Sequence, residues 1–378
     1  MSYKRFLTLI LCCSLFFLSG YVTINHNDTK IVVDDEYLGV RWYNIESKTD
    51  FPDIDYIIKR VQKDIDIKVT EGTIHFDPTR EQMFWKEGGS DGLAVDITHL
   101  RQELKKRKPE INLKTNVVKA KTEAELLATI EKRAGYSTRF DSGNAPRASN
   151  IKLSAQCFNG MIVHPGEKIS FNEVVGKRTA ERGYKEANII MDGEFVKGIG
   201  GGVCQTSTTL FNAAILAGLD VEKSHNHSLV IGYVPLGRDA MVSSCADLVL
   251  RNNTGSKIYI EAGVENSRVF FNMYGNKLKG IRYVPSTRVR EKPIKTQVQG
   301  PTPTNLEDYE RIIIERGVPA RTVDTYIEAY KGNKLLQRRK IRTSHYKGEE
   351  EVIKYQKIER VEPEESPNKL FHLLRTLL

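Results

Sequence analysis

One stretch decides how this sequence is interpreted: Gly200-Gly201-Gly202-Val203-Cys204-Gln205 places three glycines directly before a cysteine. Glycine adopts positive φ angles readily and lets the backbone approach a neighbour or ligand closely. Apolar residues then recur at helical spacing as far as Gly218, a residue type that often ends helices. We therefore expect Cys204 at the N-terminus of a helix, where unpaired N–H groups and the helix dipole favour a thiolate. The alternative is a buried structural cysteine after a tight turn.

A cysteine nucleophile also needs a base that accepts its proton. Downstream, Ser224-His225-Asn226-His227 leads into the segment 228–234, whose apolar alternation predicts a strand. We expect His227 to be the base, because this alternation starts directly after it. His225 is the alternative, since both histidines share a face if the segment is extended. Either histidine alone is more often a structural or surface residue.

A third polar group is needed to hold the imidazole in one tautomer and to stabilise the imidazolium. Two carboxylates follow His227 at a suitable distance in sequence, Asp239 and Asp247. Asp239 lies at a turn, so a turn-capping role competes with the catalytic one. The sequence leaves the choice between the two open, and Asp239 is the preferred candidate.

Further residues near the glycine run suit an acyl-transfer site. The backbone N–H groups of Gly202, Val203 and Cys204 are candidates for an oxyanion hole, and Gln205 is a candidate for an additional side-chain donor. We expect two more residues to contribute to substrate binding. Arg178 is a candidate clamp for a peptide carboxylate, and Tyr233 is a candidate wall of the pocket. The competing interpretations are a solvated basic face and ordinary packing.

The overall composition restricts the class of partner. The chain has 378 residues, with 57 Lys and Arg against 48 Asp and Glu, which gives a net charge of +9. This length suggests two or three domains, and a basic charge favours anionic partners or simply supports solubility. No nucleic-acid motif is present, so we expect no nucleic-acid partner. Anionic wall polymers or a membrane surface fit the charge better.

The N-terminus has the pattern of an export signal. Lys4 and Arg5 precede an uncharged, mostly apolar stretch from residue 6 to residue 23. No clean small-x-small cleavage site follows, so a removed signal peptide and an uncleaved membrane anchor both remain open. Either way, the expected location of the rest of the chain is extracytoplasmic, at the cell wall or the outer face of the membrane.

Cysteine usage argues against a disulfide scaffold and against zinc. Beyond the N-terminal segment the cysteines are Cys157, Cys204 and Cys245, an odd number that leaves at least one free thiol. A disulfide between Cys157 and Cys245 stays open. The sequence contains no CxxC pair and no HExxH motif, so we predict no metal site and no cofactor.

The order of helix-like and strand-like pieces predicts an α+β fold, in which the cysteine-bearing helix packs on an antiparallel β-rich half. The predicted segments are a signal segment at 1–23, a mixed α/β domain at 24–135, the motif-bearing domain at 136–275, a proline-punctuated linker at 276–308, a small β-rich module at 309–361 and a tail at 362–378. Expected strands are 66–69, 73–76, 228–234, 248–250, 257–262, 269–274, 311–315, 325–329 and 351–355. Expected helices are 96–107 and 122–132, the second opened by the capping box Thr122-Glu123-Ala124-Glu125.

The motif-bearing segment resembles a VanW domain over about residues 136–262. The matching motifs are Pro165-Gly166-Glu167, Phe171-Asn172, Val175-Gly176, Arg178-Thr179, Gly183-Tyr184, the block 200–219, His227-Ser228 and Tyr233-Val234-Pro235. The segment 24–135 resembles the peptidoglycan-binding domain often found ahead of this family. The module at 309–361 resembles the second half of the five-glycine modules found beside cell-wall enzymes.

The resemblance implies a function, because VanW-family members are implicated as L,D-transpeptidases with a cysteine nucleophile. The family name itself comes from a vancomycin-resistance gene cluster. The motif cysteine falls on Cys204 and the motif histidine on His227. We therefore expect an enzyme that forms 3-3 crosslinks between peptidoglycan stem peptides through a thioester. The alternatives are a thiol hydrolase of stem peptides and a non-catalytic peptidoglycan-binding or scaffold protein.

Overall fold

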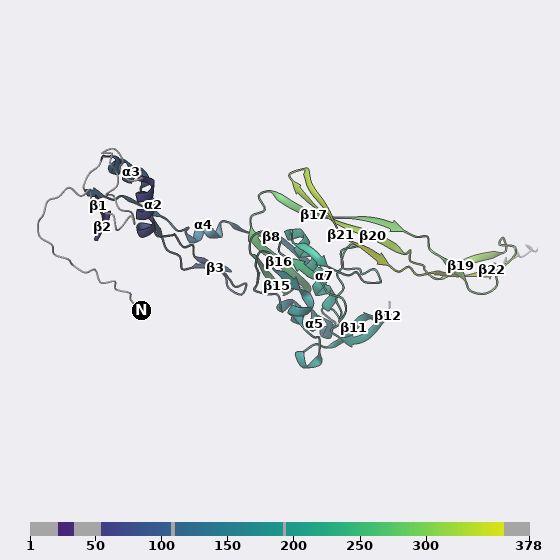
Figure 1. The fold of residues 1–378 in the computed structure, drawn as a ribbon. Helices are drawn as coiled ribbons and strands as arrows, with labels where there is room; N and C mark the ends of the chain where they lie inside the picture. Colours follow the sequence, from purple (N-terminus) through teal and green to yellow (C-terminus); the bar gives the residue numbers. More distant parts are fainter. Residues whose placement is uncertain (1–21, 34–53, 107–109, 192–193, 359–378) are drawn as a thin grey trace, which may run out of the picture. The chain divides into compact units, whose positions relative to one another are not determined.

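The computed structural model describes residues 22–33, 54–106, 110–191 and 194–358. The chain forms two compact units, Met1–His75 with Phe84–Leu127 and Phe76–Met83 with Ala128–Leu378. Helices and mostly antiparallel sheets occur in both units, which confirms the α+β class (Figure 1).

The first unit has a small core of its own. Its elements are β1 (Val22–His26), β2 (Thr29–Val33), α2 (Ile54–Ile65), β3 (Thr73–Phe76), β4 (Phe84–Glu87), β5 (Gly92–Val95), α3 (Ile97–Lys105), β6 (Glu110–Asn112), β7 (Thr115–Val118) and α4 (Glu123–Leu127), with β3 reaching one residue into the second unit. Buried side chains from α2 and α3, including Ile57, Val61, Leu100 and Leu104, pack together with Ile24 of β1. Burial of these faces follows from their helical spacing of apolar residues.

Local signals in the first unit were mostly informative. The predicted helix 96–107 is α3, and the Asp96 carboxylate caps it by accepting a hydrogen bond from His99 N at 2.9 Å. The capping box of Thr122 and Glu125 forms as expected, but α4 ends at Leu127. It stops there because the chain enters a long strand at residue 130. The predicted strand 66–69 is wrong, since that stretch contributes only an isolated bridge at Ile67.

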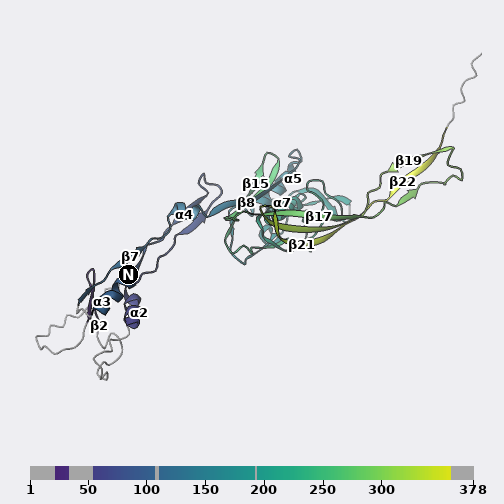
Figure 2. The same cartoon turned by 90° about the horizontal axis from the view of Figure 1, so that it is seen from above.

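The second unit is built around one buried helix, α7 (Val203–Ala217). α7 packs against the four-stranded antiparallel sheet β8-β16-β15-β9, whose strands are Ile130–Arg139, Arg268–Asn276, Ile258–Glu265 and Met161–Val163. The helix α5 (Ala145–Gln156) packs beside it (Figures 1 and 2). Every residue of α7 is buried except Cys204 and Leu216. The helix ends at Gly218, which has φ +89° as its position after the last turn requires.

Smaller elements surround this core. They are α6 (Phe171–Val175), the short 3-10 helix η2 (Ala180–Arg182), the hairpin β11 (Glu186–Met191) with β12 (Glu194–Ile199), and the sheet β10-β14-β13 (Lys168–Ser170, Val249–Arg251 and Asp220–Lys223). The strand predicted at 228–234 is wrong, because this segment forms a loop. The isolated bridge nearest to it joins His225 and Met241. The apolar residues of the loop line a pocket instead of a sheet face.

The C-terminal part forms two further sheets. One has the order β17-β20-β21 (Ile281–Glu291, Arg321–Lys331 and Lys334–Tyr346), and the other has the order β18-β22-β19 (Thr296–Val298, Glu351–Lys357 and Tyr309–Glu315). The stretch 276–308 therefore differs from the predicted linker, because β17 pairs with β20 along its whole length. Pro285 lies within β17, where it is tolerated because β17 is an edge strand. The predicted boundary at 135/136 likewise falls inside β8.

No helix in the described part of the chain is long and apolar enough to cross a bilayer. Residues 1–21 of the predicted signal segment and the predicted tail at 362–378 lie outside the described residues.

Candidate functional site

The glycine run brings three parts of the second unit together at the start of α7. Gly202 is the residue before the helix and has φ +105°. A Cβ atom on Gly202 would lie 2.9 Å from Arg147 Cγ, and one on Gly201 would lie 2.7 Å from Asn188 O. Only glycine fits at these two positions, because α5 and β11 approach the backbone so closely. Cys204 is therefore fixed as the second residue of α7.

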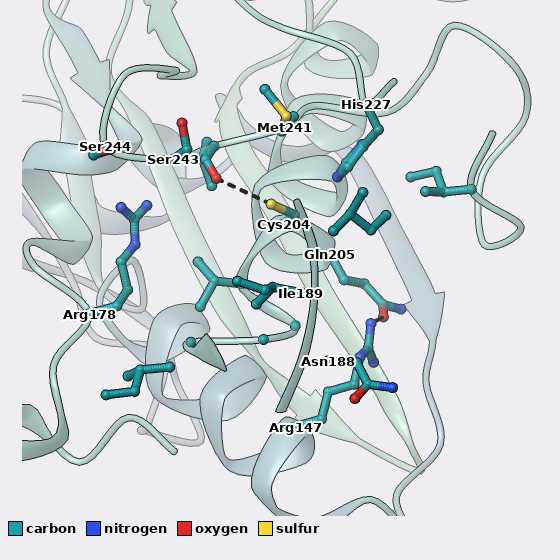
Figure 3. A pocket seen from close by; sticks show the side chains of 18 of the residues that line it. Arg147, Arg178, Asn188, Ile189, Cys204, Gln205, His227, Met241, Ser243 and Ser244 are labelled. Carbon is teal, nitrogen blue, oxygen red and sulfur yellow. Dashed lines mark hydrogen bonds between the residues drawn. The ribbon is translucent and has the colours of Figure 1, made fainter. Parts of the chain in front are cut away.

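Cys204 faces a pocket of about 1120 Å³ (Figure 3). The β11–β12 hairpin, the loop 229–233 and the segment 241–244 contribute its walls. Aliphatic side chains dominate those walls: Ile189, Ile190, Ile199, Leu229, Val230 and Ile231. Arg178 and His227 lie on opposite sides of Cys204 in this view, and Arg147 lies below it. A peptide-sized ligand fits a cavity of this volume.

The structure brings Cys204, His227 and Asp239 into contact. The His227 imidazole lies near enough to the Cys204 sulfur for the two groups to stabilise each other's charges, and His227 Nδ1 lies 2.8 Å from Asp239 Oδ2. The backbone N–H of His227 also donates to Asp239 Oδ2, at 2.6 Å. When protonated, the thiol of Cys204 donates to Val242 O at 3.3 Å, the dashed line in Figure 3. His227 and Asp239 are 4% and 1% exposed, so neither shares its hydrogen bonds with bulk water.

The electrostatics of this cluster favour an ionised thiol. Burial opposes the thiolate, but the hydrogen bond and charge of His227 outweigh burial and hold the pKa of Cys204 below its ordinary value. Burial opposes the imidazolium too, yet hydrogen bonds with Asp239 and Cys204 raise the pKa of His227 to about 9. Each group therefore favours the charged form of the other, a thiolate beside an imidazolium, which is the form that a cysteine nucleophile requires.

The structure distinguishes between Asp239 and Asp247, the two carboxylates that the sequence offered as partners of the histidine. Asp247 accepts hydrogen bonds from Ser170 Oγ at 2.6 Å and from the backbone N–H of Asn172 at 3.0 Å, so it organises the start of α6. Asp239 is the carboxylate that contacts His227. His227, whose ring contacts Asp239, is therefore the histidine of the cluster. The backbone of His225 forms a bridge with Met241.

Gln205 differs from its predicted role as an oxyanion donor. Its side-chain amide donates to Thr138 Oγ1 at 3.0 Å and to Arg139 O at 2.8 Å, while its oxygen accepts from Arg147 at 2.7 Å. These bonds use both amide hydrogens, and Gln205 is 1% exposed. The residue anchors α7 to β8 instead of offering a donor to a ligand.

The backbone donors of the glycine run are also partly used. Val203 N–H donates to Gly200 O at 3.2 Å, which closes the turn before α7. Gly202 and Cys204 both line the pocket, and their backbone N–H groups stay the candidates for an oxyanion hole.

Arg178 and Tyr233 both line the pocket, as the sequence suggested. Arg178 Nη2 donates to Asn172 Oδ1 at 2.6 Å, and its guanidinium lies over the Phe171 ring at 5.9 Å from the centroid. These contacts hold the side chain while leaving other guanidinium hydrogens available to an anion. Burial raises the pKa of Tyr233, so its phenol keeps its proton.

Two residues of the site were missed from the sequence, Arg342 and Tyr346 on β21. Tyr346 Oη donates to Asp239 Oδ1 at 2.6 Å, and Arg342 Nη2 donates to Asp239 O and, at 3.2 Å, to Asp239 Oδ1. Both lie more than 100 positions after Asp239, and no local pattern marks them. The other two described cysteines, Cys157 and Cys245, are free, so the disulfide left open by the sequence is not formed.

Fold and site together define an α+β protein with a cysteine, histidine and aspartate cluster at a helix N-terminus. Residues 146–274 match the family model described as "VanW like protein". The chain thus contains a VanW-like domain, which confirms the resemblance expected from its motifs.

Two curated relatives are similar to this chain. The "Uncharacterized protein YoaR" of Bacillus subtilis is 39% identical over 191 residues, 48% of this chain and 61% of that protein. The "Vancomycin B-type resistance protein VanW" of Enterococcus faecalis is 28% identical over 38% of this chain and 54% of that protein. The chain thus spans less than two thirds of each relative. The solved structure titled "Crystal structure of HP0197-G5" aligns with 20% of this chain and 95% of its own, at 12% identity and a TM-score of 0.14.

Proposed function

We propose that this protein is a cysteine-dependent acyltransferase of peptidoglycan, an L,D-transpeptidase that forms 3-3 crosslinks. The observation that carries the proposal is the contact of Cys204, His227 and Asp239 at the edge of a pocket of about 1120 Å³. A thiolate paired with an oriented imidazolium can cleave an amide bond and form a new one through a thioester, without ATP.

In the first step, the Cys204 thiolate attacks the carbonyl carbon of the third residue of a stem tetrapeptide. A C–S bond forms, and the backbone N–H groups of Gly202 and Cys204 stabilise the oxyanion. The C–N bond to the fourth residue then breaks. His227 gives its proton to the leaving amine, so D-alanine departs neutral at nitrogen and a thioester remains.

In the second step, a side-chain amine from the third residue of another stem attacks the thioester. His227, now neutral, accepts a proton from that amine. A new amide bond forms, the C–S bond breaks, and the thiolate and imidazolium are restored together. The aliphatic walls of the pocket favour this outcome over hydrolysis, because they limit the access of water to the thioester.

The choice of peptidoglycan as substrate has two supports. Arg178 lies in the pocket with hydrogens free to bind the carboxylate of the departing D-alanine. The similarity to a protein named for vancomycin resistance, which concerns the cell wall, points the same way. With the export-like N-terminus, these features support a site of action outside the cytoplasm, and the net charge of +9 suits an anionic wall.

The test is incubation of the purified full chain with disaccharide-tetrapeptide muropeptides, followed by mass spectrometry. We expect 3-3 crosslinked dimers and free D-alanine from the wild type and neither product from Cys204→Ala. Cys245→Ala is the matched control, because Cys245 is exposed and free, and it should retain full activity.

The other outcomes overturn the proposal in different ways. Tripeptide stems without new crosslinks would establish a thiol hydrolase. Identical muropeptides from the wild type and Cys204→Ala would leave a peptidoglycan-binding or scaffold protein.

A further inference from the structure

We propose that the C-terminal strands β20 and β21 complete the candidate active site, with Tyr346 and Arg342 as positioning residues that hold Asp239 against His227. This inference rests on the proposed thiol chemistry. Both residues lie beyond residues 146–274, the segment that matches the VanW model, so the matching segment does not contain the whole site.

The Asp239 carboxylate divides its two oxygens between two parts of the chain. Oδ2 accepts both hydrogen bonds from His227, at 2.6 and 2.8 Å. Oδ1 accepts from Tyr346 Oη at 2.6 Å and from Arg342 Nη2 at 3.2 Å. Asp239 is 1% exposed and Tyr346 is 4% exposed. With one oxygen fixed by β21, the other has one direction left, toward His227.

The loop that carries Asp239 is fixed from the same strands. Tyr346 Oη accepts a hydrogen bond from Gly237 N at 2.9 Å, and Thr325 Oγ1 of β20 donates to Gly237 O at 2.9 Å. Tyr346 therefore acts as donor to the carboxylate and as acceptor from the backbone two residues earlier. A Cβ atom on Gly237 would lie 2.4 Å from Thr325 Oγ1, so this contact leaves no room for another residue.

Arg342 also connects Asp239 with the helix that carries the thiol. Its guanidinium lies over the Phe211 ring of α7, 5.4 Å from the centroid. Its side chain is 9% exposed, and its charge lies beside the Asp239 carboxylate. Four charges are thus gathered at the site: the Cys204 thiolate, the His227 imidazolium, Asp239 and Arg342. Each negative group of this set has a positive neighbour, which lowers the cost of burying both charges.

These contacts bear on the reactivity of the thiol through His227. The imidazolium persists because Asp239 is held at 2.8 Å from Nδ1. If the carboxylate is free to rotate away, the imidazolium loses its stabilising charge and then no longer supports the thiolate. Loosening Asp239 should therefore make Cys204 react as an ordinary thiol, without any change in the residues that touch substrate.

The test measures alkylation of Cys204 by iodoacetamide against pH, in the full chain, with each cysteine quantified separately by mass spectrometry. For Tyr346→Phe we expect about a three- to tenfold slower reaction at neutral pH, the range of one lost hydrogen bond of ordinary strength. The pH profile should move toward a single alkaline step. Tyr330→Phe is the matched control, because Tyr330 on β20 also donates to a carboxylate, Glu328 at 2.7 Å, but away from the site.

Arg342→Lys and Arg342→Met supply the second comparison. Lysine keeps a donor and the charge, so we expect it to retain part of the neutral-pH reactivity that methionine loses. Thermal melts of each variant show whether it is folded. Wild-type profiles in Tyr346→Phe and Arg342→Met would overturn this inference while leaving the proposed function intact. An ordinary alkaline profile in the wild type would instead overturn the proposed function.

Discussion

At the scale of single residues, the site depends on one proton held between sulfur and nitrogen. His227 stays protonated up to about pH 9, and the pKa of Cys204 lies below its ordinary value. The ion pair thus occupies the interval between the two pKa values. Below that interval the thiolate gains a proton, and above it the imidazolium loses the proton that a leaving amine needs.

This interval predicts that Cys204 is alkylated faster than Cys245 at pH 6.5, although Cys245 is the more exposed thiol. An ordinary thiol is only about 1% ionised at that pH. The Cys204 rate should rise at a lower pH than the rate of an ordinary thiol does, and it should change again near pH 9. His227→Gln should remove the advantage, which site-resolved mass spectrometry measures. Slower labelling of Cys204 than of Cys245 in the wild type would count against an activated thiol.

Residue patterns explain which parts of the site the sequence predicted. Cys204 and His227 were found because each lies beside a local signal, a glycine run and an apolar alternation. The choice of Asp239 over Asp247 depends on a hydrogen bond that only the fold supplies. Gln205 was misassigned because its partners, Thr138 and Arg139, lie on a strand more than 60 positions away.

At the scale of elements, the start of α7 is the most constrained part of the fold. Gly202→Ala would place a Cβ atom 2.9 Å from Arg147 Cγ and 3.0 Å from Ile151 Cγ1, at a backbone φ of +105°. We expect a loss of about 3 kcal/mol or more in the free energy of unfolding, from backbone strain and overpacking together. Urea unfolding followed by circular dichroism gives the value.

Gly255→Ala separates the two contributions. Gly255 has φ +72°, but nothing lies within 4 Å of an added Cβ atom. Gly255→Ala should therefore lower the free energy of unfolding only through backbone strain, by about 1–2 kcal/mol. Equal losses in both variants would show that the close approach of α5 to the glycine run does not matter for stability.

Helices and caps were predicted correctly where the signal was local. Strands were predicted wrongly where pairing with a distant strand determines the secondary structure. The capping box, the Asp96 cap and the end of α7 at Gly218 follow from the sequence. The stretch 276–308 was assigned to a linker because of its prolines, but residues 281–291 pair with β20 as an edge strand. Likewise, the alternation after His227 lines a pocket, and residues 228–234 form a loop whose backbone accepts one hydrogen bond from Lys347 N.

At the scale of the whole molecule, the two compact units have separate hydrophobic cores. Leu100→Ala in the first unit should destabilise that unit by about 2–5 kcal/mol. We expect it to leave the alkylation rate of Cys204 unchanged, because the site lies in the second unit. Leu210→Ala in α7 is the comparison, and it should impair the thiol site.

Two measurements in this experiment report on the two units separately. Trp85 lies on β4 of the first unit, so its fluorescence follows the unfolding of that unit, while labelling of Cys204 follows the second unit. A slower Cys204 reaction in Leu100→Ala would show that the units are energetically coupled.

The burial of α7 on nearly every side has a consequence for how the protein works. A helix enclosed in this way cannot rotate or slide without opening the hydrophobic core around Phe211 and Leu210. The sulfur is therefore held in place before any ligand arrives, and the proposed reaction would need little reorganisation around it. Adaptation to different ligands then falls to the hairpin β11–β12 and the loop 229–233, which form the pocket's walls.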